Sequence, residues 1–187
     1  MTEREFMRLM AVLTGAYPGF TITEHTEAVY REMLKDLPYS AVMAAAREHI
    51  ATSSRFPTIA ELRATVAERA AGMPQPEAAW SEVEERIRAG FDGPREWSHP
   101  AIKQVVNEIG WWELCHGDDL EANHRRFVRR YRELRDETIR ALQTGRIPLP
   151  DRASREPDAR ALPAPEAADR IAMLRRRNQE LLHAIRR

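Results

Sequence analysis

Cys115, His116 and His124 lie close enough in the sequence to suggest a thiol–imidazole pair or a metal site. On a helix, adjacent residues point about 100° apart, so the Cys115 thiol and the His116 imidazole do not converge on one ion. We therefore expect a half-buried cysteine beside a surface histidine, with no bound metal. Cys115 is also the chain's one cysteine, which suits a reducing cytoplasm.

The motifs of the common enzyme classes do not occur in this sequence. There is no glycine-rich loop of the Walker type to hold a nucleotide phosphate, and no serine between glycines that would mark a nucleophile elbow. We predict no catalytic residue, no cofactor and no enzymatic activity of the chain's own.

A predicted long helix over residues 119–144 is rich in arginine, and Arg125, Arg129 and Arg132 are candidates for contacts with nucleic-acid phosphates. Carboxylates stand four residues from each, in the pairs Glu121–Arg125, Arg129–Glu133 and Arg132–Asp136, which is the spacing of solvated ion pairs on a helix surface. We expect DNA contact to be weak or indirect. A DNA-binding replication or regulatory protein is the alternative function.

The C-terminal segment, residues 167–187, has one apolar side and many arginines, so it predicts an amphipathic helix that docks in a groove of a partner protein. Its candidate contact residues are Ile171, Leu174, Leu181, Leu182, Ile185, Arg175 and Arg176. The alternatives are packing on its own core, self-association and a basic helix on a membrane surface.

Composition divides the chain of 187 residues, whose net charge is zero, into four parts. We expect one helical domain over residues 1–72, a second module over 73–145, a flexible linker rich in proline over 146–166, and the docking helix over 167–187. No apolar run approaches the roughly 20 residues of a membrane span, and the N-terminus does not resemble a signal peptide. These features predict a cytoplasmic protein.

Apolar residues recur at helical spacing throughout the first 145 residues, and no run of alternating β-branched residues predicts a strand, so the fold class is all-α. Val29 and Met33 should face inward, and so should Leu120 in the long helix. Capping boxes are expected at Thr58 with Glu61 and at Asp118 with Glu121. The predicted helices cover residues 3–14, 24–37, 38–52, 58–71, 77–89, 98–110 and 119–144.

A set of motifs in the first domain resembles a known family. They are Tyr17-Pro-Gly-Phe20, Val29-Tyr30-x-x-Met33-Leu34, Tyr39-Ser-x-Val42, His49-Ile-Ala-Thr52 and Phe56-Pro-Thr-Ile-Ala-Glu61. Over about residues 4–70 the chain is similar to the phage and prophage proteins that load and inhibit the replicative helicase, as in a Bacillus phage. The region from Trp80 to Tyr131 resembles an accessory domain of related phage replication proteins.

This resemblance implies a helical adaptor without catalytic activity, acting in the cytoplasm of a bacterial host. Its partners would be a DnaB-type hexameric helicase, which the adaptor restrains or loads, and an origin-bound initiator protein. The family's helicase contact lies in the C-terminal part, in agreement with the docking helix predicted from the residues of the tail.

Overall fold

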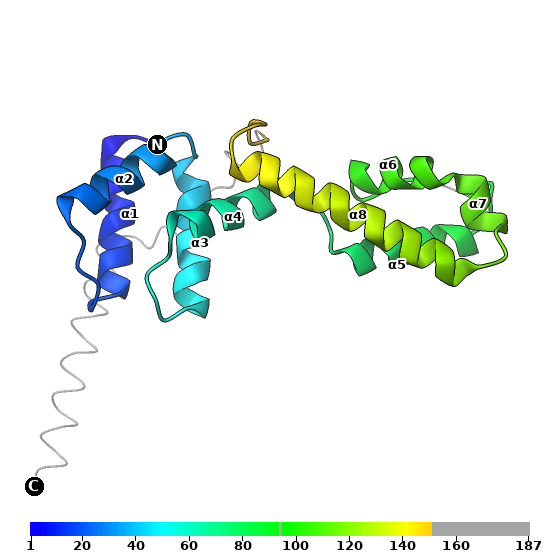
Figure 1. Cartoon of the computed structure of the whole chain (residues 1–187), viewed down its shortest axis with the longest axis horizontal. Coiled ribbons are helices and arrows are strands. Elements are labelled where there is room, and N and C mark those ends of the chain that lie inside the picture. The colour runs from blue at the N-terminus through cyan, green and yellow to red at the C-terminus, as the bar shows by residue number, and fades with distance from the viewer. Residues whose placement is uncertain (94, 151–187) are drawn as a thin grey trace, which may run out of the picture. The chain divides into compact units, whose positions relative to one another are not determined.

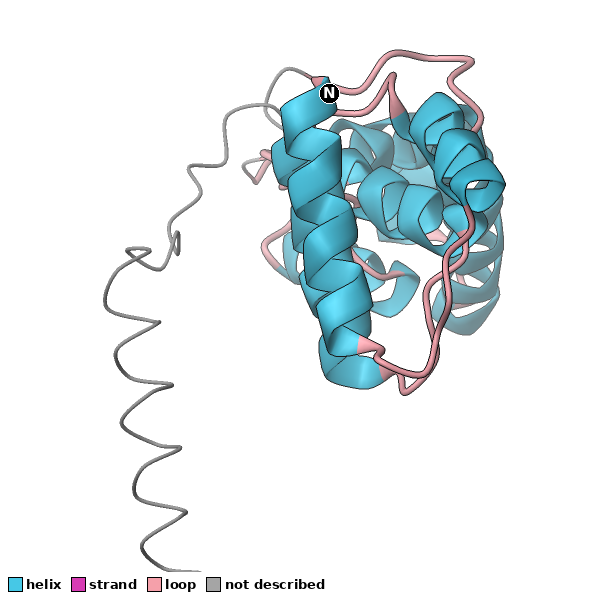
Figure 2. Cartoon of the chain, turned by 90° about the vertical axis from the view of Figure 1, so that its left-hand side faces the viewer, coloured by secondary structure: helices cyan, strands magenta, loops and turns pink. Residues whose placement is uncertain are grey.

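The computed structural model describes residues 1–93 and 95–150, which belong to one unit, Met1–Arg155. These residues form helices and loops without a strand, which confirms the all-α prediction (Figure 2). The helices, labelled in Figure 1, are α1 (Glu3–Ala16), α2 (Glu24–Leu34), α3 (Tyr39–Thr52), α4 (Ile59–Ala71), α5 (Pro76–Arg88), α6 (Pro100–Ile109), α7 (Trp111–His116) and α8 (Leu120–Gln143).

The first hydrophobic core lies among α1 to α4. On α1, the spacing of Phe6, Leu9 and Leu13 places all three on one face, and each is at most 1% exposed. Leu34 from α2, Val42 from α3 and Leu62 from α4 complete the centre of this core. Each such side chain stabilises the fold by about 1.5–3 kcal/mol before the entropy of ordering is subtracted.

A second core forms among α5, α6, α7 and α8. Its buried side chains include Trp80 on α5, Ile102 on α6, Trp111 on α7, and Phe127 with Tyr131 on α8. The last two rings stack with centroids 5.6 Å apart. Burial raises the pKa of Tyr131 to about 12. Its hydroxyl donates to the Pro74 carbonyl, which ties α8 to the segment between α4 and α5.

The two cores are connected by the packing of α4 against the C-terminal part of α8. The Arg63 Nε donates to the Gln143 carbonyl over 2.8 Å, and Arg135 pairs with Glu68 over 3.2 Å. After α8 ends at Gln143, Leu149 packs against the first core, although the sequence predicted a linker from residue 146 onward.

Three side chains predicted to face inward do not. Val29 and Met33 on α2 are 41% and 48% exposed, and Leu120 at the start of α8 is 45% exposed. Fewer apolar residues of α2 are buried than its sequence pattern suggests. Leu34 is buried and Tyr30 is half-buried, while the neighbouring apolar side chains face solvent. Apolar spacing defines the side of a helix but not how much of it a neighbour covers.

Helix boundaries follow local chemistry. The predicted capping box of Thr58 with Glu61 is confirmed at the start of α4. At α8 the capping residue is Asp119, whose Oδ1 accepts from the Ala122 amide, so the prediction of Asp118 was wrong by one residue. The six-residue helix α7 was not predicted, because Gly110 ends α6 and only a short segment follows.

No helix in residues 1–93 and 95–150 has the length and apolarity of a membrane span. The tail residues predicted to bind a partner, Ile171, Leu174, Arg175, Arg176, Leu181, Leu182 and Ile185, lie outside the described residues.

Candidate functional site

The corner between α3 and α4 is formed by residues 53–58 and is held around the Phe56 ring. Phe56 is 8% exposed. Three aromatic side chains surround it: Phe20 stacks on it with centroids 4.2 Å apart, while Tyr17 and Tyr30 approach edge-on at 5.8 and 5.9 Å. The corner therefore fixes the turn after Tyr17 and helix α2 to the start of α4.

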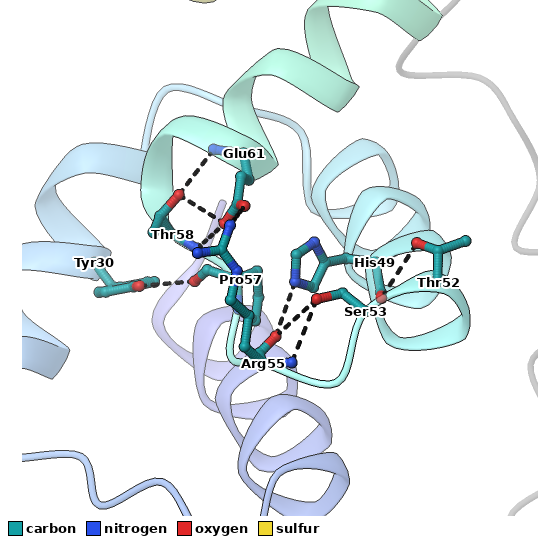
Figure 3. Close-up of polar contacts among 8 residues, drawn as sticks. All are labelled: Tyr30, His49, Thr52, Ser53, Arg55, Pro57, Thr58 and Glu61. Atoms are coloured by element: carbon teal, nitrogen blue, oxygen red, sulfur yellow. Dashed lines mark hydrogen bonds and ion pairs between the residues drawn. The ribbon is translucent and has the colours of Figure 1, made fainter.

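The main chain of this corner is satisfied by side chains from other elements (Figure 3). The Tyr30 hydroxyl donates to the Pro57 carbonyl over 2.8 Å, and the Tyr17 hydroxyl donates to the Ser53 carbonyl over 3.1 Å. The His49 Nε2 lies 2.9 Å from the Arg55 carbonyl, within hydrogen-bond distance for an Nε2–H donor. A loop without regular structure is thus left with few unpaired carbonyls.

Thr58 and Glu61 then start α4. The Glu61 carboxylate accepts from the Thr58 amide and hydroxyl, and these hydrogen bonds hold the pKa of Glu61 below its usual value. Arg55 pairs with the same carboxylate. The residues of the motif from Phe56 to Glu61 are therefore engaged in the protein's own fold, which gives this motif a structural role.

A comparison with protein families gives a match within the first domain. Residues 1–63 match the family model of the N-terminal domain of the helicase loader of Bacillus phage SPP1. The resemblance to a phage helicase loader is confirmed for this domain. The match covers the helices that surround the first core and ends within α4. Neither the curated proteins nor the solved structures gave a match to the chain.

The arginine-rich surface of α8 is less self-paired than its sequence predicts. Arg125 pairs with Glu121 over 2.6 Å, as expected. Arg129 and Arg132 form no ion pair with any residue of the described chain, so those two predicted pairs were wrong. Glu133 instead lies 3.5 Å from Arg130, which stands three residues before it on the same helix.

A shallow cleft of about 320 Å³ separates this surface from α6. Arg126 and Arg129 line it with Arg130, whose Nε donates to Glu108 over 2.6 Å. That hydrogen bond lowers the pKa of Glu108. Arg126 was not among the candidate contacts predicted from the sequence, although no carboxylate stands three or four residues from it. The cleft unites Arg126 with Arg129, whereas Arg125 and Arg132 lie outside its lining.

The residues considered for thiol or metal chemistry have other contacts. The His124 Nε2 lies 2.9 Å from a Glu77 carboxylate oxygen, and its ring stacks on Trp80. His116 is exposed, and burial raises the pKa of the half-buried Cys115 thiol. Within the described chain, no group of three or more potential metal ligands occurs.

Proposed function

We propose that this chain is a non-enzymatic adaptor that binds a DnaB-type replicative helicase and loads or restrains it during phage DNA replication. The observation that carries the proposal is the match of residues 1–63 to the N-terminal domain of a helicase loader. An origin-bound initiator is the second proposed partner, and the bacterial cytoplasm is the proposed place of action.

In this proposal the four parts of the chain divide the work. The domain of residues 1–72 and the module of residues 73–145 form the folded body, residues 146–166 are a linker, and residues 167–187 dock on the helicase. Support for the docking segment comes from its apolar side, Ile171, Leu174, Leu181, Leu182 and Ile185, and from the adjacent Arg175 and Arg176.

The experiment is a titration of a purified DnaB-type helicase with the full chain, followed by sedimentation and by ATP hydrolysis. We expect a complex of defined stoichiometry and a change in the helicase's ATPase rate. If the sedimentation of the helicase is the same with and without the chain, at concentrations up to tens of micromolar, the proposal is wrong.

A second function, direct contact with nucleic acid through α8, is favoured by one observation. Arg126, Arg129 and Arg132 are exposed and have no carboxylate partner in the described part of the chain. Each arginine that contacts a phosphate contributes to a binding constant that falls steeply with salt. Binding of a duplex that is lost in R126E/R129E and kept in R4E/R8E, a control with the same change of charge on α1, would support this function.

A further inference from the structure

An exposed cluster of aromatic rings lies at the end of the second core where α7 is found. Trp112 is 63% exposed, and its ring stacks on His116 with centroids 5.1 Å apart. Phe91, in the loop between α5 and α6, is 41% exposed and lies 5.5 Å from the same imidazole. We call Phe91, Trp112 and His116 the aromatic patch.

The backbone beneath the aromatic patch is fixed. Trp111, which adjoins Trp112, is 8% exposed and packs edge-on against Trp97 in the second core. Its indole Nε1–H donates to the Phe91 carbonyl over 3.0 Å, so the loop and α7 are tied together. Trp112 therefore faces solvent from a rigid helix. Tryptophan is among the side chains enriched at the residues that dominate binding in protein–protein interfaces.

Carboxylates without cation partners border the aromatic patch in the sequence. Asp92 follows Phe91, Glu113 follows Trp112, and Asp118 lies two residues after His116. None of the three forms an ion pair with a residue that the structure describes. A cation, Arg95, also lies in this region, with its guanidinium 5.8 Å from the centre of the Trp111 ring.

The negative charge of these carboxylates favours one of two classes of ligand. Single-stranded nucleic acid stacks its bases on exposed aromatic rings, but such platforms lie in basic grooves that attract phosphates. The carboxylates here would repel phosphates. An arginine or lysine side chain instead gains a cation–π contact with Trp112 and an ion pair with a neighbouring carboxylate.

We propose that the aromatic patch, with Asp92, Glu113 and Asp118, is a docking surface for a segment of a partner protein that presents arginine or lysine. None of these residues belongs to the segment of residues 167–187 or to the arginines of α8. The surface therefore stands independently of the proposed helicase contact.

The test uses the full chain and a synthetic 14-residue helical peptide with three arginines and two leucines on one face. The same peptide with glutamate for arginine is the control. Binding is followed by the four tryptophan indole N–H signals in nitrogen–proton NMR spectra, with the Trp112 signal assigned by its loss in W112A. We expect the arginine peptide to shift chiefly the Trp112 signal, and the glutamate peptide to leave it unmoved.

Variants locate the contact. W112A should weaken binding at least tenfold without lowering the melting temperature, because this side chain is mostly exposed. D92N/E113Q/D118N should weaken binding roughly tenfold and reduce its salt dependence. M7A removes another exposed apolar side chain, this one from α1, and should change nothing.

Several outcomes would overturn the proposal. One is unchanged binding in W112A, and another is equal binding of the two peptides. A shift of the Trp112 signal by oligo(dT) would make the surface a nucleic-acid platform. A shift on dilution of the chain would instead show that a second copy occupies it.

Discussion

Arg63 and Asp36 face each other in a two-bond ion pair: the Nη1 lies 2.8 Å from Oδ1, and the Nη2 lies 2.8 Å from Oδ2. The same guanidinium donates to the Met33 carbonyl over 2.7 Å and to the Gln143 carbonyl over 2.8 Å. One side chain on α4 thus joins the end of α2 to the end of α8. Its donors are nearly all used, which is typical of an arginine that is only 13% exposed.

Replacing Arg63 with methionine should therefore destabilise the protein. The change removes the Arg63 donors from two carbonyls and from the Asp36 carboxylate. We expect a loss of about 2–3 kcal/mol, a figure that already allows for the partial exposure of Asp36. That loss corresponds to a melting temperature lower by about 5–10 °C. R88M, which removes an exposed pair with Glu84, should change it by no more than about 2 °C. Equal melting of the two variants would show that Arg63 does not join these elements.

The same pair predicts a dependence of stability on pH. The Arg63 hydrogen bonds hold the pKa of Asp36 below its usual value. Asp36 therefore stabilises the folded protein fully when the pH is above its pKa in the unfolded chain, about 3.9. This contribution is lost as the pH falls through its lower pKa in the folded protein. At pH 6, D36N should be less stable than wild type.

The difference between wild type and D36N should shrink as the pH falls below about 4. Urea unfolding of both proteins at matched pH values measures it. The lowered pKa values of Glu5, Glu61 and Glu108 affect both proteins equally and so cancel in the comparison. A difference that is constant down to pH 3 would mean that the Asp36 carboxylate is not favoured by folding.

The start of α4 predicts a matched pair of substitutions. The Thr58 hydroxyl accepts from the Glu61 amide, so T58A should cost about 1 kcal/mol. T58S keeps the hydroxyl and should cost less than half as much. Thermal unfolding of the two variants distinguishes the cap from simple loss of side-chain volume. If T58S unfolds as early as T58A, the hydrogen bond is not the cause.

How much of this could be predicted from the sequence depended on how local each feature is. The capping box of Thr58 with Glu61 spans one turn, and the sequence was sufficient to find it. The shift from Asp118 to Asp119 shows the limit, because two adjacent aspartates are equally good caps and only the loop geometry selects one. Helix α7 is too short to give an apolar period.

Features that depend on contacts distant in the sequence could not be predicted. Arg63 and Gln143 are 80 residues apart, and no residue type marks them as partners. The ion pair of Arg130 with Glu108 on α6 likewise joins residues 22 apart that no local pattern relates. The aromatic patch had one local signal, two adjacent tryptophans of which a six-residue helix can bury only one.

The docking role of residues 167–187 is the central claim, and paired variants of this segment test it. L174D/L182D places charges on the apolar side, whereas Q179D/H183D adds the same number of aspartates away from that side. Burial of a leucine at an interface stabilises by about 1.5–3 kcal/mol before ordering entropy is subtracted, so losing two should weaken binding more than tenfold. The control pair should reduce affinity only through charge, and this effect should fade with added salt.

The most direct measurement is a titration of a purified DnaB-type helicase with wild type and both variants, accompanied by thermal melting of each protein. We expect that L174D/L182D loses binding, that Q179D/H183D keeps it at moderate salt, and that all three proteins melt within about 2 °C of one another. If L174D/L182D binds the helicase as tightly as wild type, the contact does not lie on the apolar side of residues 167–187, and the central claim is contradicted.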